Sequence, residues 1–170
     1  VDGDTIRSSA STALGSGAIK LVLLGAAANG SGNAAANSIS GSSFANSLFG
    51  GGGNDSLSGF AGNDRLTGGV GADLLRGGAG SDIFDFNAAN QSGITAATSD
   101  RILDFVRGAD RIDLLTIDTR TDLAGDQAFA FRGTGVFTGA GQVRYYLQDL
   151  AGTADDRTII EGNLTGTAPA

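Results

Sequence analysis

Four aspartates stand at a constant spacing in the middle of the chain. They are Asp55, Asp64, Asp73 and Asp82, each nine residues after the last, and a glycine lies two residues before each of them. Short carboxylates beside glycines are typical of turns and of ligands for hard cations, not of charged helix faces. The whole chain shows the same bias, because it holds 17 aspartates and a single glutamate. The spacing therefore indicates cation-binding chemistry.

The aspartates belong to a nine-residue repeat, G-G-x-G-x-D-x-(apolar)-x. Residues 50–58, 68–76 and 77–85 match every position, and residues 59–67 differ only at the second position, where Phe60 replaces glycine. The eighth position is apolar throughout: Leu57, Leu66, Leu75 and Phe84. A single match to this pattern carries little weight, whereas four in tandem without an insertion indicate a repeat architecture.

Two weaker copies of the repeat precede residue 50. Residues 32–40 and 41–49 keep the nine-residue period, but Asn37 and Asn46 replace the aspartate. These asparagines either supply weak, half-charged metal sites or form hydrogen-bonded ladders, and we favour the ladders.

The repeats must fold into elements that bring the aspartates together. In a helix, nine residues make about two and a half turns, so successive aspartates would face opposite sides. The 12 glycines of residues 50–80 also disfavour a helix. In a plain antiparallel sheet the apolar position would change faces at every repeat. A coil of two repeats avoids both conflicts, since short parallel strands alternate with turns and each coil stacks on the last about 4.8 Å away.

This stacking places Asp55 beside Asp73 and Asp64 beside Asp82, with the apolar eighth positions inside a thin core. Two carboxylates about 5 Å apart repel each other by roughly 3 kcal/mol at an effective dielectric of about 20. No lysine lies in the repeats, and their arginines fall outside the turns. Carboxylates with backbone carbonyls, and no nitrogen or sulfur ligand, favour calcium over magnesium. We therefore expect the repeats to be disordered without the ion.

The composition excludes several other functions. The chain has no histidine and no cysteine, so a Ser-His-Asp triad, a thiol nucleophile and a His/Cys zinc site are all absent. Hydrolysis by paired carboxylates is poorly supported, because the aspartates form a uniform array. A net charge of −7 argues against a nucleic-acid partner, and no apolar run is long enough for a membrane span. We therefore expect no enzymatic activity in this chain.

At this point the sequence resembles the RTX nonapeptide repeats, a pattern already known as a calcium-binding β-helix repeat. Residues 100–114 extend the likeness, because the order D-x-I-x-D-F followed by G-x-D-x-I-D-L is similar to the C-terminal module of serralysin-type secreted proteases. The resemblance implies an all-β fold, a right-handed parallel β-roll followed by a β-sandwich-like cap. It also implies a bacterial protein that leaves the cell through a type I secretion machinery and folds outside on binding calcium.

The resemblance implies ligands by position in the repeat. In each site one turn supplies the carbonyls of its second and fourth residues and its aspartate, and the stacked turn supplies the carbonyls of its first and third residues and its own aspartate. The first expected site comprises Gly51, Gly53, Asp55, Gly68, Val70 and Asp73, and the second comprises Phe60, Gly62, Asp64, Gly77, Ala79 and Asp82. A third ion, held by Asp82, Gly78 and Gly80, would be closed by Asp100.

For several residues the sequence allows more than one role. Asp104, Asp110 and Asp113 are expected to cap turns instead of binding metal. Arg101, Arg107 and Arg111 either pair with neighbouring aspartates, which we favour, or form a patch for an anionic polysaccharide. The aromatic residues around Tyr145 favour a β-sandwich core over a sugar-binding platform. The alternative function is accordingly a carbohydrate-binding or adhesive module of an extracellular protein.

The expected organisation has four parts. Residues 1–31 form strands that cap or extend the roll, and residues 32–86 form the roll, with the strongest repeats at 50–85. Residues 87–161 form a β-rich cap with a helical turn at 121–127 and strands at 128–132, 142–148 and 157–161. Residues 162–170 form an unpaired tail.

Overall fold

A computed structural model describes residues 4–26, 28–88, 91, 98–114, 130–131, 142–148 and 157–163. The chain divides into two compact units, residues 1–114 and residues 115–170, and each is described by itself. All regular elements of the described residues are β-strands, and among them no helix is long and apolar enough to cross a membrane. The all-β fold class is therefore confirmed.

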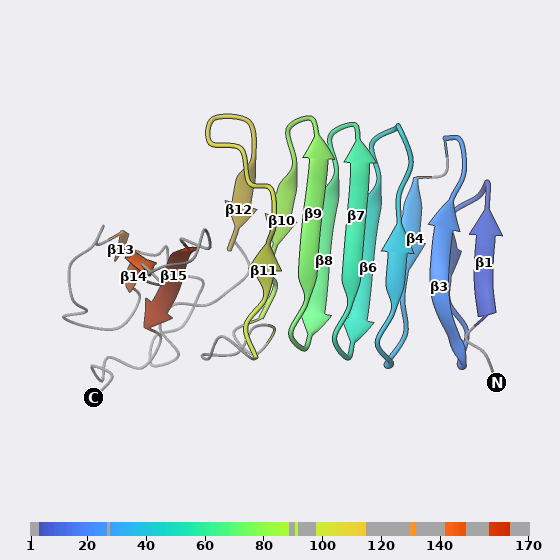
Figure 1. The fold of residues 1–170 in the computed structure, drawn as a ribbon, viewed down its shortest axis with the longest axis horizontal. Helices are drawn as coiled ribbons and strands as arrows, with labels where there is room; N and C mark the ends of the chain where they lie inside the picture. Colours follow the sequence, from blue (N-terminus) through green and yellow to red (C-terminus); the bar gives the residue numbers. More distant parts are fainter. Residues whose placement is uncertain are drawn as a thin grey trace, which may run out of the picture. The chain divides into compact units, whose positions relative to one another are not determined.

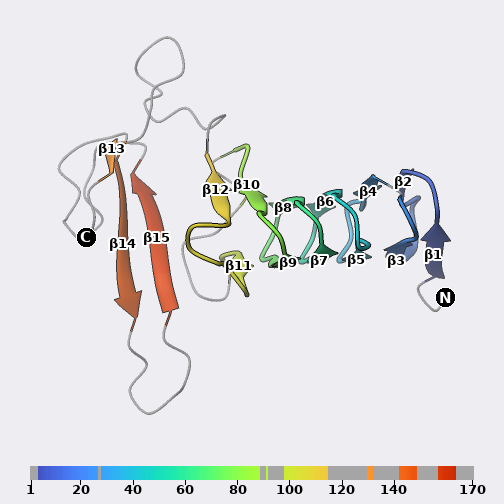
Figure 2. The same ribbon diagram turned by 90° about the horizontal axis from the view of Figure 1, so that it is seen from above.

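The first unit is a roll of two parallel six-stranded sheets (Figures 1 and 2). One sheet, sheet A, holds the odd-numbered strands β1 (Asp4–Ser8), β3 (Ala18–Leu23), β5 (Ser38–Ser40), β7 (Ser56–Ala61), β9 (Leu74–Ala79) and β11 (Arg101–Ile102). The other, sheet B, holds the even-numbered strands β2 (Thr12–Ala13), β4 (Asn29–Ser31), β6 (Ser47–Gly52), β8 (Arg65–Val70), β10 (Ile83–Asp85) and β12 (Arg111–Asp113).

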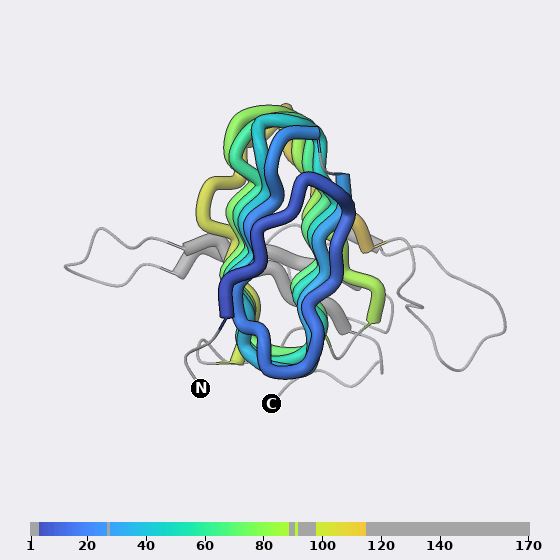
Figure 3. Tube along the Cα trace, turned by 90° about the vertical axis from the view of Figure 1, so that its right-hand side faces the viewer, coloured from blue at the N-terminus to red at the C-terminus, as the bar shows by residue number. Residues whose placement is uncertain are grey.

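The pairing register follows the sequence period. Leu57 in β7 is the partner of Leu75 in β9, and Leu48 in β6 is the partner of Leu66 in β8, so each strand pairs with the strand two repeats later. Viewed along the roll, successive coils superimpose (Figure 3). The predicted coil of two repeats is thus confirmed.

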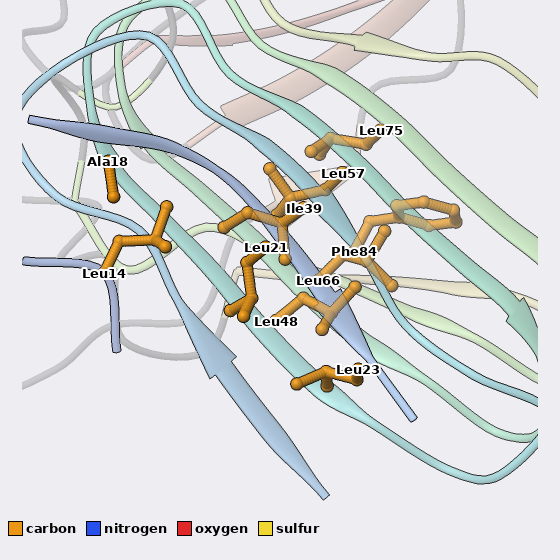
Figure 4. Close-up of a cluster of buried hydrophobic side chains, with 10 residues drawn as sticks. All are labelled: Leu14, Ala18, Leu21, Leu23, Ile39, Leu48, Leu57, Leu66, Leu75 and Phe84. Atoms are coloured by element: carbon orange, nitrogen blue, oxygen red, sulfur yellow. The ribbon is translucent and has the colours of Figure 1, made fainter. Parts of the chain in front are cut away.

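The core is a narrow double layer between the two sheets (Figure 4). The eighth residue of each repeat points inward, and Leu57, Leu66, Leu75 and Phe84 are all no more than 1% exposed. Ile39 and Leu48 of the asparagine repeats lie in the same cluster. Since full burial of such a side chain is worth about 1.5–3 kcal/mol, these stacks hold the sheets together.

The roll reaches beyond the nine-residue motif on both sides. β1 to β4 form its first strands, and β11 and β12 pair with β9 and β10 after the motif has ended at residue 86. A growing sheet presents unpaired backbone N–H and C=O groups at its edge, which any extended segment can pair with. Strands of the roll therefore form without the glycine-rich repeat.

The second unit contains one described sheet. β13 (Ala130–Phe131) pairs in parallel with β14 (Gln142–Gln148), which pairs antiparallel with β15 (Arg157–Asn163). The strands predicted at 142–148 and 157–161 are confirmed, and β15 extends two residues into the expected tail. The helical turn predicted at 121–127 and residues 164–170 lie outside the described residues.

Candidate metal centres

The turns of the roll form two columns, one along each edge. Turns 50–55 and 68–73 follow strands of sheet B and share one edge, and turns 59–64 and 77–82 follow strands of sheet A and share the other. The backbone N–H of Asp55 donates to Asp73 Oδ1 at 2.7 Å, and that of Asp64 donates to Asp82 Oδ1 at 2.8 Å. The structure therefore stacks the same pairs of aspartates that the repeat predicts.

Among the described residues, one oxygen of each of these four carboxylates has no hydrogen-bond partner. The side chains of Asp55, Asp64, Asp73 and Asp82 are at most 2% exposed, and the Oδ2 atom of each is buried without a hydrogen bond. Among the described residues, no arginine or lysine forms an ion pair with any of them. A buried carboxylate oxygen without a partner carries a large desolvation cost, so these atoms call for a positive group.

Burial raises the pKa of all four aspartates. Loss of solvent raises the pKa of Asp55 to about 7 and that of Asp64 to about 6, although in each case a backbone N–H bond lowers it and the stacked aspartate raises it further. The pKa values of Asp73 and Asp82 are also raised, chiefly by burial. The metal-free roll therefore resists full ionisation of its own carboxylates.

Backbone carbonyls line the space between the first pair of turns. Gly51 and Gly53 have φ angles of 109° and 93°. A Cβ atom placed on Gly69 would lie 2.1 Å from the Gly51 oxygen, and one on Gly71 would lie 1.9 Å from the Gly53 oxygen. These contacts leave no room for a side chain beside the carbonyls. Val70 is half exposed, so only its backbone is available to a site inside the turn.

The second pair of turns has the same geometry in spite of Phe60. Phe60 adopts a φ of 78°, close to the positive angles of the glycines at the second position, and its side chain is exposed. A Cβ atom placed on Gly78 would lie 2.1 Å from the Phe60 carbonyl oxygen, and one placed on Gly80 would lie 1.8 Å from the Gly62 carbonyl oxygen. The carbonyl of Ala79 accepts a hydrogen bond from Gly62 N at 2.9 Å. Phe60 thus keeps the backbone of the turn at a steric cost.

The asparagine turns close differently. Asn37 Oδ1 accepts a hydrogen bond from Asn33 N at 2.7 Å, and Asn46 Oδ1 accepts one from Ser42 N at 2.7 Å. Neither Asn33 nor Ser42, which hold the second position of these repeats, has a positive φ. The backbone amides also continue the ladder, because Asn37 N donates to Asp55 Oδ1 at 2.7 Å. In these turns the asparagine side-chain oxygens are therefore occupied by hydrogen bonds within the protein, as the ladder alternative expects.

The expected pairing of Asp100 with Asp82 is wrong. Asp100 Oδ1 accepts a hydrogen bond from Asp73 N at 2.8 Å, on the opposite edge from Asp82. Asp110 takes the place beside Asp82, whose N–H donates to Asp110 Oδ1 at 3.0 Å. The reason is that Asp100 directly precedes β11 of sheet A, whereas Asp110 directly precedes β12 of sheet B.

A signal for Asp110 was present in the sequence. The segments Asp100-Arg-Ile102 and Asp110-Arg-Ile112 both reproduce the D-x-(apolar) end of the repeat. Asp110 and Asp104 do act as caps: Asp110 Oδ2 accepts Val106 N at 2.7 Å, and Asp104 accepts the N–H groups of Gly77 and Gly78, each at 3.0 Å. Burial raises the pKa of Asp100 to about 7, with its backbone hydrogen bond opposing and Asp73 adding to the shift.

The ion pairs expected for Arg101, Arg107 and Arg111 are also not formed among the described residues. The pairs there use other arginines, since Arg65 lies 2.9 Å from Asp85 and 3.2 Å from Asp113, and Arg76 lies 3.9 Å from Asp104. Arg101 and Arg111 belong to strands of different sheets, so the three arginines do not share one face.

Each candidate centre combines two carboxylates with backbone carbonyls. Within the described part of the chain, no group of three or more acidic, histidine or cysteine side chains comes together. Any cation held here would have oxygen ligands only, most of them from the backbone. Such a donor set fits a hard cation.

Comparison with known proteins identifies the family. Residues 22–153 match the family described as peptidase M10 serralysin C terminal, which is well over half of the chain, so the chain belongs to that family. One similar solved structure is the AlgE6R3 subunit of an Azotobacter vinelandii mannuronan C5-epimerase, 31% identical over 73% of this chain and 70% of that chain, with a TM-score of 0.47. None of the curated proteins compared with it matches. The resemblance to RTX-type C-terminal modules is thus confirmed.

Proposed function

We propose that this chain is a non-catalytic calcium-binding module whose roll folds fully only when calcium enters its turns. The observation that carries the proposal is the set of four buried aspartate oxygens without a partner among the described residues, in turns where glycine carbonyls closely approach the stacked turn. Bound calcium would supply the positive charge that lets adjacent carboxylates stay ionised in a desolvated turn.

The proposed ligands follow the two edges of the roll. The first site uses Asp55, Asp73 and the carbonyls of Gly51, Gly53, Gly68 and Val70, and the second uses Asp64, Asp82 and the carbonyls of Phe60, Gly62, Gly77 and Ala79. Two terminal sites continue the columns, one between Asp73 and Asp100 and one between Asp82 and Asp110, the latter with the carbonyls of Gly78 and Gly80. The geometry that supports the terminal sites is the continued ladder of backbone donors to carboxylates.

Membership of the serralysin C-terminal family supports the wider part of the proposal. We infer that the parent protein is bacterial, passes a type I secretion machinery and acts outside the cell. Where calcium is scarce, stacked aspartates would keep the repeats unfolded, and at 100 times its Kd each bound ion would add about 2.7 kcal/mol. Extracellular calcium modules commonly bind at about 10⁻⁴–10⁻³ M, so folding would begin where calcium is abundant.

The test is a calcium titration followed by far-UV circular dichroism. We expect a cooperative gain of β signal near millimolar calcium that magnesium does not reproduce. Asp73→Asn should move the midpoint to higher calcium by about tenfold or more, because Asp73 contributes to two sites. Asp4→Asn, at an exposed position of β1, is the matched control and should leave the midpoint unchanged. Full β structure in excess chelator at neutral pH would refute the proposal.

A further inference from the structure

The two sheets of the roll present outer faces of different charge. Strand alternation and register place twelve side chains on the outer face of sheet A, here called face A: Thr5, Arg7, Lys20, Val22, Ser38, Ser40, Ser56, Ser58, Phe60, Leu74, Arg76 and Arg101. Four of these residues are cationic and none is acidic. The charged residues of this set are therefore all basic in a chain of net charge −7, and Asp4, exposed at the start of β1, is the one acidic residue within the strands of sheet A.

The cations of face A are available to solvent. Arg7, Lys20, Arg76 and Arg101 are all exposed. Among the described residues, Arg76 has only a loose contact of 3.9 Å with Asp104, and the other three take part in no ion pair. They lie in two groups, Arg7 with Lys20 on neighbouring strands and Arg76 with Arg101 on neighbouring strands, separated by the serines of β5 and β7.

The outer face of sheet B gives the contrast. Its charged residues are Arg65, Asp85, Arg111 and Asp113, two of each sign. Arg65 bonds both aspartates, and Asp85 is only 5% exposed. The charges of that face thus neutralise one another, so the basic character belongs to face A alone.

In the described part of the chain, Asp104 is the one acidic residue that pairs with a cation of face A, at 3.9 Å from Arg76. Residues 4–114 contain ten aspartates and seven lysines or arginines, but four of those aspartates are buried in the turns and would be neutralised by bound ions. Calcium loading would therefore make the field at face A more positive. In this respect the inference rests on the proposed function.

We propose that face A binds an extended anionic polysaccharide. Six strands at about 4.8 Å give a flat track about 24 Å from β1 to β11, comparable to a short run of sugar units. Basic groups at both ends would contact carboxylate or sulfate groups, and the serine hydroxyls between them would bond sugar hydroxyls. Nucleic acid is the poorer partner, because four cations are few for a phosphate backbone and the strands of face A carry no aromatic residue apart from Phe60 at one border.

The experiment measures binding of polygalacturonate oligomers by titration calorimetry in millimolar calcium and low salt, with neutral dextran oligomers as the uncharged probe. The variants are Arg76→Gln/Arg101→Gln on face A and Arg111→Gln on the other face. Arg111 is the matched control, since it is an exposed arginine in β12, at the β-strand position that corresponds to Arg101 in β11. Circular dichroism of every variant in calcium establishes first that the roll is folded.

We expect binding of polygalacturonate but not dextran, weakened about tenfold or more by the face A variant, weakened further by salt, and unchanged in Arg111→Gln. Absence of binding by a folded chain, or equal loss in the Arg111 variant, would overturn the proposal while leaving calcium-dependent folding intact. Vesicles containing anionic lipid are the remaining arm, and tighter binding to them than to polygalacturonate would also overturn it. A chain that stays unfolded in calcium would contradict the proposed function instead.

Discussion

Phe60 is the one non-glycine residue with a positive φ among the described residues, and it stands at a position that the repeat reserves for glycine. A side chain in this region costs about 1–2 kcal/mol relative to ordinary backbone angles. The surrounding turn must supply that energy, because Phe60 itself is 56% exposed and gains little from packing. At the residue scale, then, the turn geometry overrides local preference.

We predict that Phe60→Gly stabilises the roll. Relief of the strain exceeds the extra entropy of glycine in the unfolded chain, so the net gain should be up to about 1 kcal/mol. The calcium midpoint should fall accordingly, as measured by circular dichroism. Phe44→Gly, a second exposed phenylalanine without a positive φ, is the control and should not stabilise. An unchanged or higher midpoint for Phe60→Gly would contradict this account.

At the scale of the element, each turn works through the close approach of its backbone to the stacked turn. A comparison of the asparagine turns with the glycine turns shows the effect of this close approach. Asn37 and Asn46 bond the N–H four residues earlier, whereas in the glycine turns the second residue takes a positive φ and the equivalent oxygen of aspartate is left without a donor. The glycine turn is therefore built around an oxygen cradle that the asparagine turn lacks.

Alanine substitutions at two glycines distinguish the effect of backbone strain from the effect of blocking the oxygen cradle. Gly69 and Gly108 have similar φ angles, 103° and 91°, but a Cβ on Gly69 would lie 2.1 Å from the Gly51 carbonyl, whereas one on Gly108 would meet nothing within 4 Å. Both alanine variants should lose about 1 kcal/mol to backbone strain. Only Gly69→Ala should also raise the calcium midpoint by more than about tenfold in the titration. Equal calcium midpoints for the two variants would show that the space beside the Gly51 carbonyl is not needed for calcium binding.

At the scale of the whole molecule, the roll stores acidic groups in its edges and so couples folding to protons as well as to calcium. In the metal-free fold, burial raises the pKa of Asp55 and Asp100 to about 7 and that of Asp64 to about 6, against 3.8 for an ordinary aspartate. The folded state thus binds more protons than the unfolded state at pH values between about 4 and 7. The contribution of these groups to stability is fully present below about pH 4 and is lost as the pH rises through 6 to 7.

We therefore predict opposite pH dependences with and without calcium. The demetallated chain should show more β signal near pH 4 than at pH 7.5. Calcium binding requires ionised carboxylates, so its midpoint should move to higher calcium as the pH falls below about 6. Circular dichroism across pH, on protein dialysed free of metal and on the same protein with calcium, measures both trends. A metal-free signal that increases from pH 4 to 7.5 would contradict the assigned sign.

The sequence by itself determined the repeating part of this protein. A strict period of nine makes the pairing register countable, so the stacked pairs Asp55–Asp73 and Asp64–Asp82 and the buried stacks of Leu57, Leu66 and Leu75 follow from spacing alone. Each repeat sees the same neighbours as the last, and local rules therefore suffice.

Only the tertiary structure decided what lies outside the period. Asp100 and Asp110 stand 27 and 28 residues after their stacked partners, in place of the regular 18, so counting could not assign them to an edge. The same holds for the basic face, because Arg101 and Arg111 are only ten residues apart but belong to different sheets. After residue 86 the connections change length, and which strand edge each segment pairs with depends on contacts between distant parts of the chain.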